Sequence, residues 1–194
     1  DDTYNASPVS MKAGLEVLNS LNVNNTYTLS TTKELAEQYS LKTISDLKSL
    51  PQPVTICSTL AFMNREDGLL GVEDRYGFQF DKKGVDGSAR YTALMNGEGQ
   101  VIDAYSTDGL LKKFDLAVLE DDAGGFPPYY AVPVFRGEIM EKYPEIREIT
   151  EQLASVLSTD VMAGLNYLVD EEGQKPQDVA HEFLQENLPE YASK

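Results

Sequence analysis

The sequence predicts an α/β fold in which a central unit of alternating strands and helices is entered and left through two extended segments. Short apolar strands alternate with capped helices over residues 33–122, which is the pattern of an α/β lobe. Extended segments lie on either side of this unit, at Thr26–Leu29 and Tyr129–Phe135. Beyond Gly137, apolar residues recur at helical spacing. A chain threaded in this way is expected to form a hinged protein of two lobes.

The segment before the central unit carries the weakest pattern. Met11, Leu15 and Leu18 stand at helical spacing and predict a short helix, which a strand near Val23 would follow. Within Asn24–Leu29, polar side chains enter what would otherwise be an apolar strand. We interpret this polar strand as the first crossing into the central unit.

The central unit contains strands that are short, apolar and bounded by turn residues, namely Val54–Ser58, Val101–Tyr105 and Leu116–Leu119. Its helices are marked by capping residues and by glycine or proline stops. They are Lys33–Tyr39, Ser45–Leu50, Arg65–Tyr76 and a helix that starts at Asp86 or Ser88 and ends at Met95. Gly68 and Gly71 interrupt the third of these helices, and Gly77 is expected to end it. Directly after Tyr105, the good helix caps in Ser106–Asp108 predict a strand-to-helix corner.

The return segment, Gly125–Phe135, contains three prolines. Each proline holds φ at about −65° and lacks an N–H donor, so the segment cannot be an ordinary central strand. It is predicted to be a rigid extended crossing that becomes strand-like from Tyr129 onward. Tyr129 and Tyr130 would then point to opposite faces, so that one can enter a core while the other faces a cleft. A proline-rich loop with a buried aromatic residue is the alternative interpretation.

The C-terminal region is predicted to be helical. A helix around residues 139–140 ends at Pro144, and residues 146–157 form an amphipathic helix. The hydroxyl pair at 158–159 caps the next helix, and Pro176 opens the last one.

Composition limits the classes of partner. The net charge is −16, because 32 acidic residues oppose 16 basic ones, so we expect no nucleic acid and no anionic membrane surface as a direct partner. No run of about 18 apolar residues predicts a membrane-spanning helix. Cys57 is the only cysteine and His181 the only histidine, which excludes an internal disulfide framework and a multi-cysteine metal site. We expect Cys57 to be buried and unreactive and His181 to be exposed.

The sequence lacks the common motifs of catalysis. It has no phosphate-binding glycine loop, no dinucleotide fingerprint and no His-Glu-x-x-His pair. Nucleophilic catalysis by serine or cysteine usually needs a histidine base, and His181 has no partner pattern nearby. The adjacent carboxylates Asp121 and Asp122 are more simply explained as a solvated loop. We therefore predict no enzymatic activity, no cofactor and no metal site.

Tyr27, Tyr105 and Tyr129 differ from the tyrosines of the predicted helices, because they fall at the crossings or at a strand end. These are the places where an α/β fold presents ligand contacts. Three tyrosine faces around one cleft would attract a cation that lacks N–H donors, because the ring quadrupole needs no hydrogen bond. From spacing alone, packing of these rings in a core remains the alternative explanation.

Several blocks of the sequence closely resemble the substrate-binding proteins of osmoprotectant ABC importers, the glycine betaine/carnitine/choline-binding proteins. The resemblance covers nearly all of the chain, with the blocks in the same order. It rests on Asn24–Leu29, Thr32–Leu47, Asp67-Gly68, Tyr91–Leu94, Val101–Gly109, Phe126–Val134, Leu165–Tyr167 and the Val169-Asp170-x-x-Gly173-x-x-Pro176 turn.

This resemblance implies a type II periplasmic-binding-protein fold, a two-lobed clamshell whose ligand sits in an aromatic cage between the lobes. The family's cage residues fall on Tyr27, Tyr105 and Tyr129, and a polar ligand contact falls on Asn25. The implied ligand is a small quaternary-ammonium osmolyte such as choline, glycine betaine or carnitine. The implied partner is a membrane ABC permease. The implied location is extracytoplasmic, either periplasmic or at the cell surface through a lipid anchor or a fusion to the permease.

The resemblance also sets the expected domain boundaries. Residues 1–32 would form part of the first lobe and the first crossing strand, residues 33–122 a complete second lobe, and residues 123–194 the return crossing and the C-terminal helices of the first lobe. Family members begin with a longer N-terminal segment, so we expect one complete and one partial lobe. Weak or absent ligand binding would follow, as would an exposed first-lobe surface open to self-association of the truncated chain.

Two other functions stay open at this stage. A ligand-sensing regulatory domain can use the same fold, and a fused helix-turn-helix or permease segment in the complete reading frame would distinguish it. The same cleft can also serve a binding protein for another small solute.

Overall fold

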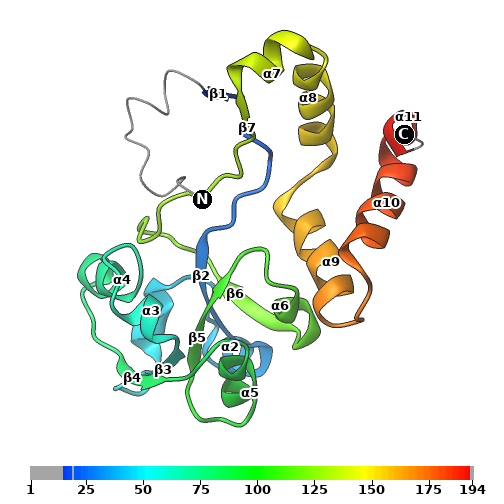
Figure 1. The fold of residues 1–194 in the computed structure, drawn as a ribbon. Helices are drawn as coiled ribbons and strands as arrows, with labels where there is room; N and C mark the ends of the chain where they lie inside the picture. Colours follow the sequence, from blue (N-terminus) through cyan, green and yellow to red (C-terminus); the bar gives the residue numbers. More distant parts are fainter. Residues whose placement is uncertain (1–14, 19, 193–194) are drawn as a thin grey trace.

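The computed structural model describes residues 15–18 and 20–192. A five-stranded sheet, seen in the lower part of Figure 1, has the strand order β4-β3-β5-β2-β6. Its strands are β2 (Tyr27–Thr32), β3 (Thr55–Ser58), β4 (Asp81–Gly84), β5 (Val101–Tyr105) and β6 (Leu116–Leu119). β3 pairs in parallel with β4 and β5, whereas β2 pairs in the antiparallel sense with β5 and β6. The α/β character that the sequence predicts is confirmed.

Helices cover both faces of this sheet. Those on one face are α2 (Lys33–Tyr39), the 3-10 helix η2 (Ser45–Ser49), α3 (Leu60–Met63) and α4 (Leu69–Tyr76). Those on the other face are α5 (Ala89–Met95) and α6 (Gly109–Lys113). Ile56 belongs to the first core and Cys57 to the second, because neighbouring residues of a strand point to opposite faces. The predicted burial of Cys57 is confirmed, since its side chain is inaccessible to solvent.

Two extended segments, residues 20–26 and 127–133, run side by side between the sheet and the rest of the chain (Figure 1). Their backbone hydrogen bonds join Leu21 N–H to the Ala131 carbonyl (2.8 Å), Ala131 N–H to the Val23 carbonyl (2.9 Å) and Asn25 N–H to the Tyr129 carbonyl (3.0 Å). The first segment continues directly into β2 in the middle of the sheet. Regular strand structure in the second segment begins only at Val134, later than predicted, because prolines interrupt the ladder.

The helix predicted through Met11, Leu15 and Leu18 is wrong for the described residues. Leu15–Val17 form strand β1, which pairs antiparallel with β7 (Val134–Arg136), while Met11 lies outside the described residues. Pairing with a distant strand therefore overrides the local helical spacing.

The helix predicted over Arg65–Tyr76 begins later, at Leu69. A side chain at Gly68 would place its Cβ 2.5 Å from the Phe62 carbonyl oxygen, so only glycine allows the chain to turn this closely over α3. The turn leaves residues 64–68 outside the helix, beside the extended segments. The predicted stop at Gly77 is confirmed, since this residue adopts a left-handed conformation with φ of 67°.

The C-terminal region is helical, as predicted. Its elements are α7 (Gly137–Lys142), α8 (Ile146–Val156), α9 (Thr159–Asp170), α10 (Pro176–Asn187) and α11 (Pro189–Ala192). The Ser158 hydroxyl caps α9 by accepting a hydrogen bond of 3.1 Å from the Val161 N–H. α9 lies against α6, next to the sheet (Figure 1), and the Asn166 side-chain amide donates to the Thr107 carbonyl at 3.0 Å. The predicted exposure of His181, on α10, is confirmed.

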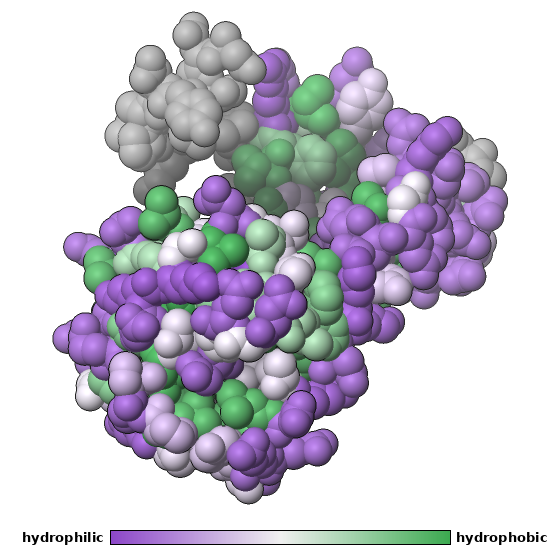
Figure 2. Space-filling view, turned by 90° about the horizontal axis from the view of Figure 1, so that it is seen from below, coloured by the Kyte–Doolittle hydropathy of each residue, from purple (hydrophilic) through white to green (hydrophobic). Residues whose placement is uncertain are grey.

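The face seen in Figure 2 is mostly hydrophilic, with hydrophobic residues in small groups between polar ones. This surface agrees with the excess of acidic residues in the sequence. Among the described residues, no helix has the length and the apolar character needed to span a membrane.

Candidate functional site

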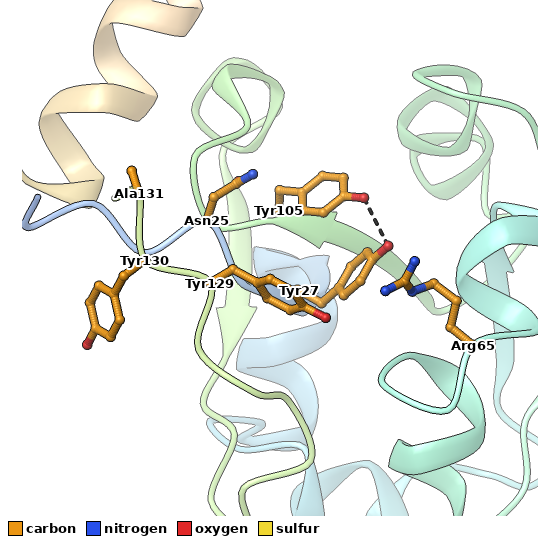
Figure 3. A pocket seen from close by; sticks show the side chains of 7 residues that line it. All are labelled: Asn25, Tyr27, Arg65, Tyr105, Tyr129, Tyr130 and Ala131. Atoms are coloured by element: carbon orange, nitrogen blue, oxygen red, sulfur yellow. Dashed lines mark hydrogen bonds between the residues drawn. The ribbon is translucent and has the colours of Figure 1, made fainter. Parts of the chain in front are cut away.

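An open cavity of about 450 Å³ lies where the two extended segments meet the sheet. The four residues predicted to contact a ligand all line this cavity, and three further residues complete the lining. Figure 3 shows the full set, which is Asn25, Tyr27, Arg65, Tyr105, Tyr129, Tyr130 and Ala131. The structure therefore brings the predicted side chains together from three separate stretches of the chain.

Tyr27 and Tyr105 form the inner wall of the cavity. They are partners in the antiparallel register of β2 and β5, so their side chains project from the same face of the sheet. Their rings stack with centroids 4.6 Å apart and an interplanar angle of 27°. The Tyr105 hydroxyl donates a hydrogen bond of 2.9 Å to the Tyr27 hydroxyl (Figure 3). The pair thus presents a continuous aromatic surface.

Further aromatic rings hold Tyr27 in place from behind. The Phe62 ring lies 4.8 Å from the Tyr27 ring and the Phe126 ring lies 6.2 Å from it, measured between centroids. Burial, and then the hydrogen bond with Tyr105, raises the pKa of the Tyr27 phenol. Tyr27 therefore stays neutral and acts through its ring.

Tyr129 forms the outer wall. Its ring meets the Tyr27 ring edge-on, at 88° and with centroids 6.4 Å apart. The backbone of Tyr129 is fixed on both sides, because its N–H donates to the Asn24 side-chain oxygen (2.6 Å) and its carbonyl accepts from the Asn25 N–H (3.0 Å). Tyr130 points away from the other rings and is 55% exposed (Figure 3). The expectation that one of the two adjacent tyrosines enters a core is wrong, because Tyr129 is also 37% exposed.

The strand-to-helix corner after β5 orients Tyr105. The Asp108 carboxylate accepts hydrogen bonds from the Tyr105 N–H (3.1 Å) and from the Tyr91 hydroxyl (2.7 Å). It also pairs with Arg90, whose Nη2 lies 3.2 Å away and whose side chain is almost fully buried. The predicted capping role of Asp108 is replaced by this network, since Asp108 makes no side-chain cap bond to α6.

Asn25 lies at the exposed rim of the cavity. Its side-chain oxygen accepts a hydrogen bond of 2.6 Å from the Thr107 hydroxyl. This bond fixes the amide and directs its nitrogen to serve as a donor for a ligand.

Arg65 is a charged side chain of the cavity lining that the sequence reasoning missed. It was predicted to lie inside a helix, whereas it stands on the loop before α4 and reaches the cavity (Figure 3). Its guanidinium donates two hydrogen bonds to Asp67, from Nε at 2.7 Å and from Nη2 at 2.6 Å. The cluster of charged residues directly before Gly68 was the signal that could have indicated a loop.

The arrangement can hold a small organic cation. Three neutral rings meet around one open volume, and ring faces attract a cation without needing hydrogen bonds from it. Asn25 and Arg65 add hydrogen-bond donors at the rim. No group of three or more metal-ligating side chains is found in the part of the chain that the structure describes.

Comparisons with known proteins identify the family of the chain. The family described as the substrate binding domain of ABC-type glycine betaine transport systems matches residues 2–186. The ergothioneine transport permease/ergothioneine binding protein of Helicobacter pylori is 38% identical over 166 residues, which are 85% of this chain and 30% of that protein. The glycine-betaine-binding protein of Pseudomonas aeruginosa is 38% identical over 186 residues, or 90% of this chain and 60% of that protein.

The solved structures agree as well. The crystal structure of a glycine betaine/carnitine/choline ABC transporter matches with a TM-score of 0.80 at 36% identity, covering 89% of this chain and 64% of that chain. The fold is thus of the type II periplasmic-binding class. The chain spans from 30% to 60% of the length of the two curated relatives. Members of the matching family are substrate-binding proteins of transport systems and not enzymes. The chain belongs to the family of substrate binding domains of ABC-type glycine betaine transport systems.

Proposed function

We propose that this chain captures a small quaternary-ammonium compound, such as choline, glycine betaine or carnitine, outside the cytoplasm for import by a membrane ABC permease. The observation that carries the proposal is the meeting of Tyr27, Tyr105 and Tyr129 around one open cavity. The stacked pair and the edge-on ring leave an aromatic corner that suits a trimethylammonium group.

Each ring contact with a desolvated cation is worth about 1–2 kcal/mol, so three contacts account for useful affinity without any ion pair. The polar end of the ligand would point to the rim. There the Asn25 amide can meet a hydroxyl, and the Arg65 guanidinium can meet a carboxylate. These two donors would fix the orientation of the ligand in the cavity.

Ligand binding would favour closure of the two lobes by its higher affinity for the closed form. The paired segments 20–26 and 127–133 are the candidate hinge, since they run side by side as extended chain between the sheet and the upper elements of Figure 1. The lobe boundaries at residues 32 and 122 stay a prediction. The permease would recognise the closed form.

A second candidate is a different small solute. The Helicobacter pylori relative, at 38% identity, is named for ergothioneine and not for an osmolyte. We therefore include ergothioneine among the ligands to be tested.

Isothermal titration calorimetry of the full-length protein with choline, glycine betaine, carnitine and ergothioneine tests the proposal. Titration to millimolar ligand also detects weak binding. We expect heat with at least one of the first three, and an affinity for it that falls roughly tenfold in Tyr105→Ala, because one ring contact is lost. Tyr143→Ala is the matched control, since Tyr143 is exposed and lies outside the cavity. No heat with any of the three, or an unchanged affinity in Tyr105→Ala, would contradict the proposal.

A further inference from the structure

Asp67 links two residues of the cavity although it does not line the cavity itself. Its Oδ1 accepts from Arg65 Nε at 2.7 Å, and its Oδ2 accepts from Arg65 Nη2 at 2.6 Å. The Tyr129 hydroxyl donates a hydrogen bond to the same Oδ2. One carboxylate therefore holds together Arg65, which is the only cationic side chain among the described residues of the lining, and the outer aromatic wall.

The two partners of Asp67 come from different parts of the fold. Arg65 stands on the loop before α4, where Gly68 allows the chain to pass close to α3. Tyr129 belongs to the return segment. The Arg65 and Asp67 side chains are 49% and 32% exposed, so their pairing adds little to the stability of the fold. The effect of Asp67 is instead on the cavity beside it.

That effect is electrostatic. A guanidinium with a full positive charge at the rim would repel a ligand that is itself a cation. The paired carboxylate cancels this charge while leaving Arg65 in place. The hydrogen bond from Tyr129 to an anion also fixes the rotation of the ring that faces the ligand, and it increases the electron density of that ring.

We propose that Asp67 is a positioning residue that sets the specificity of the cavity, because it neutralises Arg65 and holds Tyr129 so that a cation without a carboxylate can bind. With Asp67 charged, the cavity accepts choline. Without this charge, Arg65 would pair more strongly with the carboxylate of a zwitterion such as glycine betaine. The inference rests on the proposed function, since it assigns the ligand preference of the same site.

Asp67 stays charged over the whole physiological range. Hydrogen bonds from Arg65, and then from Tyr129, lower the pKa of its carboxyl to about 2. The same contact raises the pKa of the Tyr129 phenol above its ordinary value. A raised pKa of Tyr129 is therefore a sign of the hydrogen bond between Tyr129 and Asp67 that can be measured without ligand.

The test is the ratio of choline affinity to glycine betaine affinity, measured by calorimetry in Asp67→Asn. Asparagine keeps the shape of the side chain and removes its charge. A hydrogen bond to a charged group is worth about 1.5–3 kcal/mol, so we expect the ratio to shift toward glycine betaine by roughly tenfold or more. Asp67→Glu, which restores the charge, should move the ratio back toward that of the wild type.

Asp74→Asn is the matched control, because Asp74 is an exposed carboxylate on the nearby helix α4 and does not line the cavity. It removes the same charge and should leave the ratio unchanged. Circular dichroism shows whether each variant is folded. An unchanged ratio in a folded Asp67→Asn, or an equal shift in Asp74→Asn, overturns the inference while the proposed function stands.

The ligand-free readout is a pH titration of Tyr129 by NMR with 13C-labelled tyrosine. Its pKa should fall in Asp67→Asn and stay raised in Asp74→Asn. An unchanged Tyr129 pKa in Asp67→Asn also overturns the inference, because the contact would then not exist. If the wild type binds neither choline nor glycine betaine, the specificity role fails, and the proposed function fails with it only when carnitine does not bind either.

Discussion

The Tyr27 side chain is 7% exposed and stacks on Tyr105 while packing against Phe62. It therefore contributes to the hydrophobic core and to the cavity wall at the same time. The ring supplies the packing, and the hydroxyl supplies one hydrogen bond, from Tyr105. These two contributions can be separated by substitution.

Tyr27→Phe should lower the free energy of unfolding by about 1 kcal/mol, because only the hydrogen bond with Tyr105 is lost. Tyr27→Ala should lower it by about 3–5 kcal/mol, because it leaves a cavity in a packed aromatic cluster. Urea unfolding followed by circular dichroism measures both values. If both substitutions lowered the free energy of unfolding by the same amount, the Tyr27 ring would not be part of the core.

Sequence position was sufficient to single out Tyr27, Tyr105 and Tyr129, because strand ends and crossings converge in an α/β fold. The same reasoning could not find Arg65. Its role depends on the turn at Gly68, where the close approach to the Phe62 carbonyl is visible only in three dimensions. Whether these side chains contact a ligand stays a prediction.

At the scale of elements, helix α9 packs against α6 through a very close contact. A Cβ at Gly109, the first residue of α6, would lie 2.6 Å from the Tyr167 Cα on α9. The two helices can approach this closely only because residue 109 lacks a side chain. This contact joins α9 to the sheet unit in the conformation that the structure shows.

Gly109→Ala should destabilise the protein by about 1–3 kcal/mol, because backbone atoms of α9 must move to accept the methyl group. Gly164→Ala is the matched control within α9, since a Cβ there meets no atom within 4 Å. It should stabilise the protein by about 0.5–1 kcal/mol, as alanine favours a helix interior over glycine. Thermal unfolding of both variants gives the comparison. We expect the two substitutions to change the stability in opposite directions. An unchanged stability of Gly109→Ala would contradict the close contact between α6 and α9.

The elements that the sequence predicted well are those with an apolar face and clear caps. β5 and β6 have the predicted bounds, because both are apolar strands between turns. β4 was not predicted, since all four residues of Asp81–Gly84 are exposed and it is a strand only through pairing with β3. β1 was missed for a related reason, because its partner β7 lies far along the chain. The local spacing of apolar residues does not show which distant strands pair with each other.

For the whole molecule, the sheet unit is well packed, whereas the C-terminal helices bury little. α9 has no fully buried side chain, and Thr150 is the one buried residue of α8 among the described residues. The strong net charge of −16 favours the approach of a cation to the cavity at low salt. The overall arrangement thus combines a well-packed sheet unit with an aromatic-lined cavity at the point where the extended segments enter it.

At this scale, the sequence predicted the fold class through its resemblance to a family, and the comparisons confirm that family. The preferred ligand could not be predicted in the same way. Choline, glycine betaine and carnitine share the trimethylammonium group that the tyrosine rings would hold, and they differ only at the polar end. Discrimination there would depend on the charges of Arg65 and Asp67, which form an ion pair that the sequence reasoning did not find.

The proposed function requires a trimethylammonium group to sit among Tyr27, Tyr105 and Tyr129. Intermolecular nuclear Overhauser effects between the N-methyl protons of bound choline or glycine betaine and tyrosine ring protons test it most directly, with signals assigned through single Tyr→Phe variants. We expect Overhauser effects between the N-methyl protons and these three rings, and none between the N-methyl protons and the exposed ring of Tyr143. Effects that are absent from the three rings, or as strong to Tyr143 as to them, would contradict it.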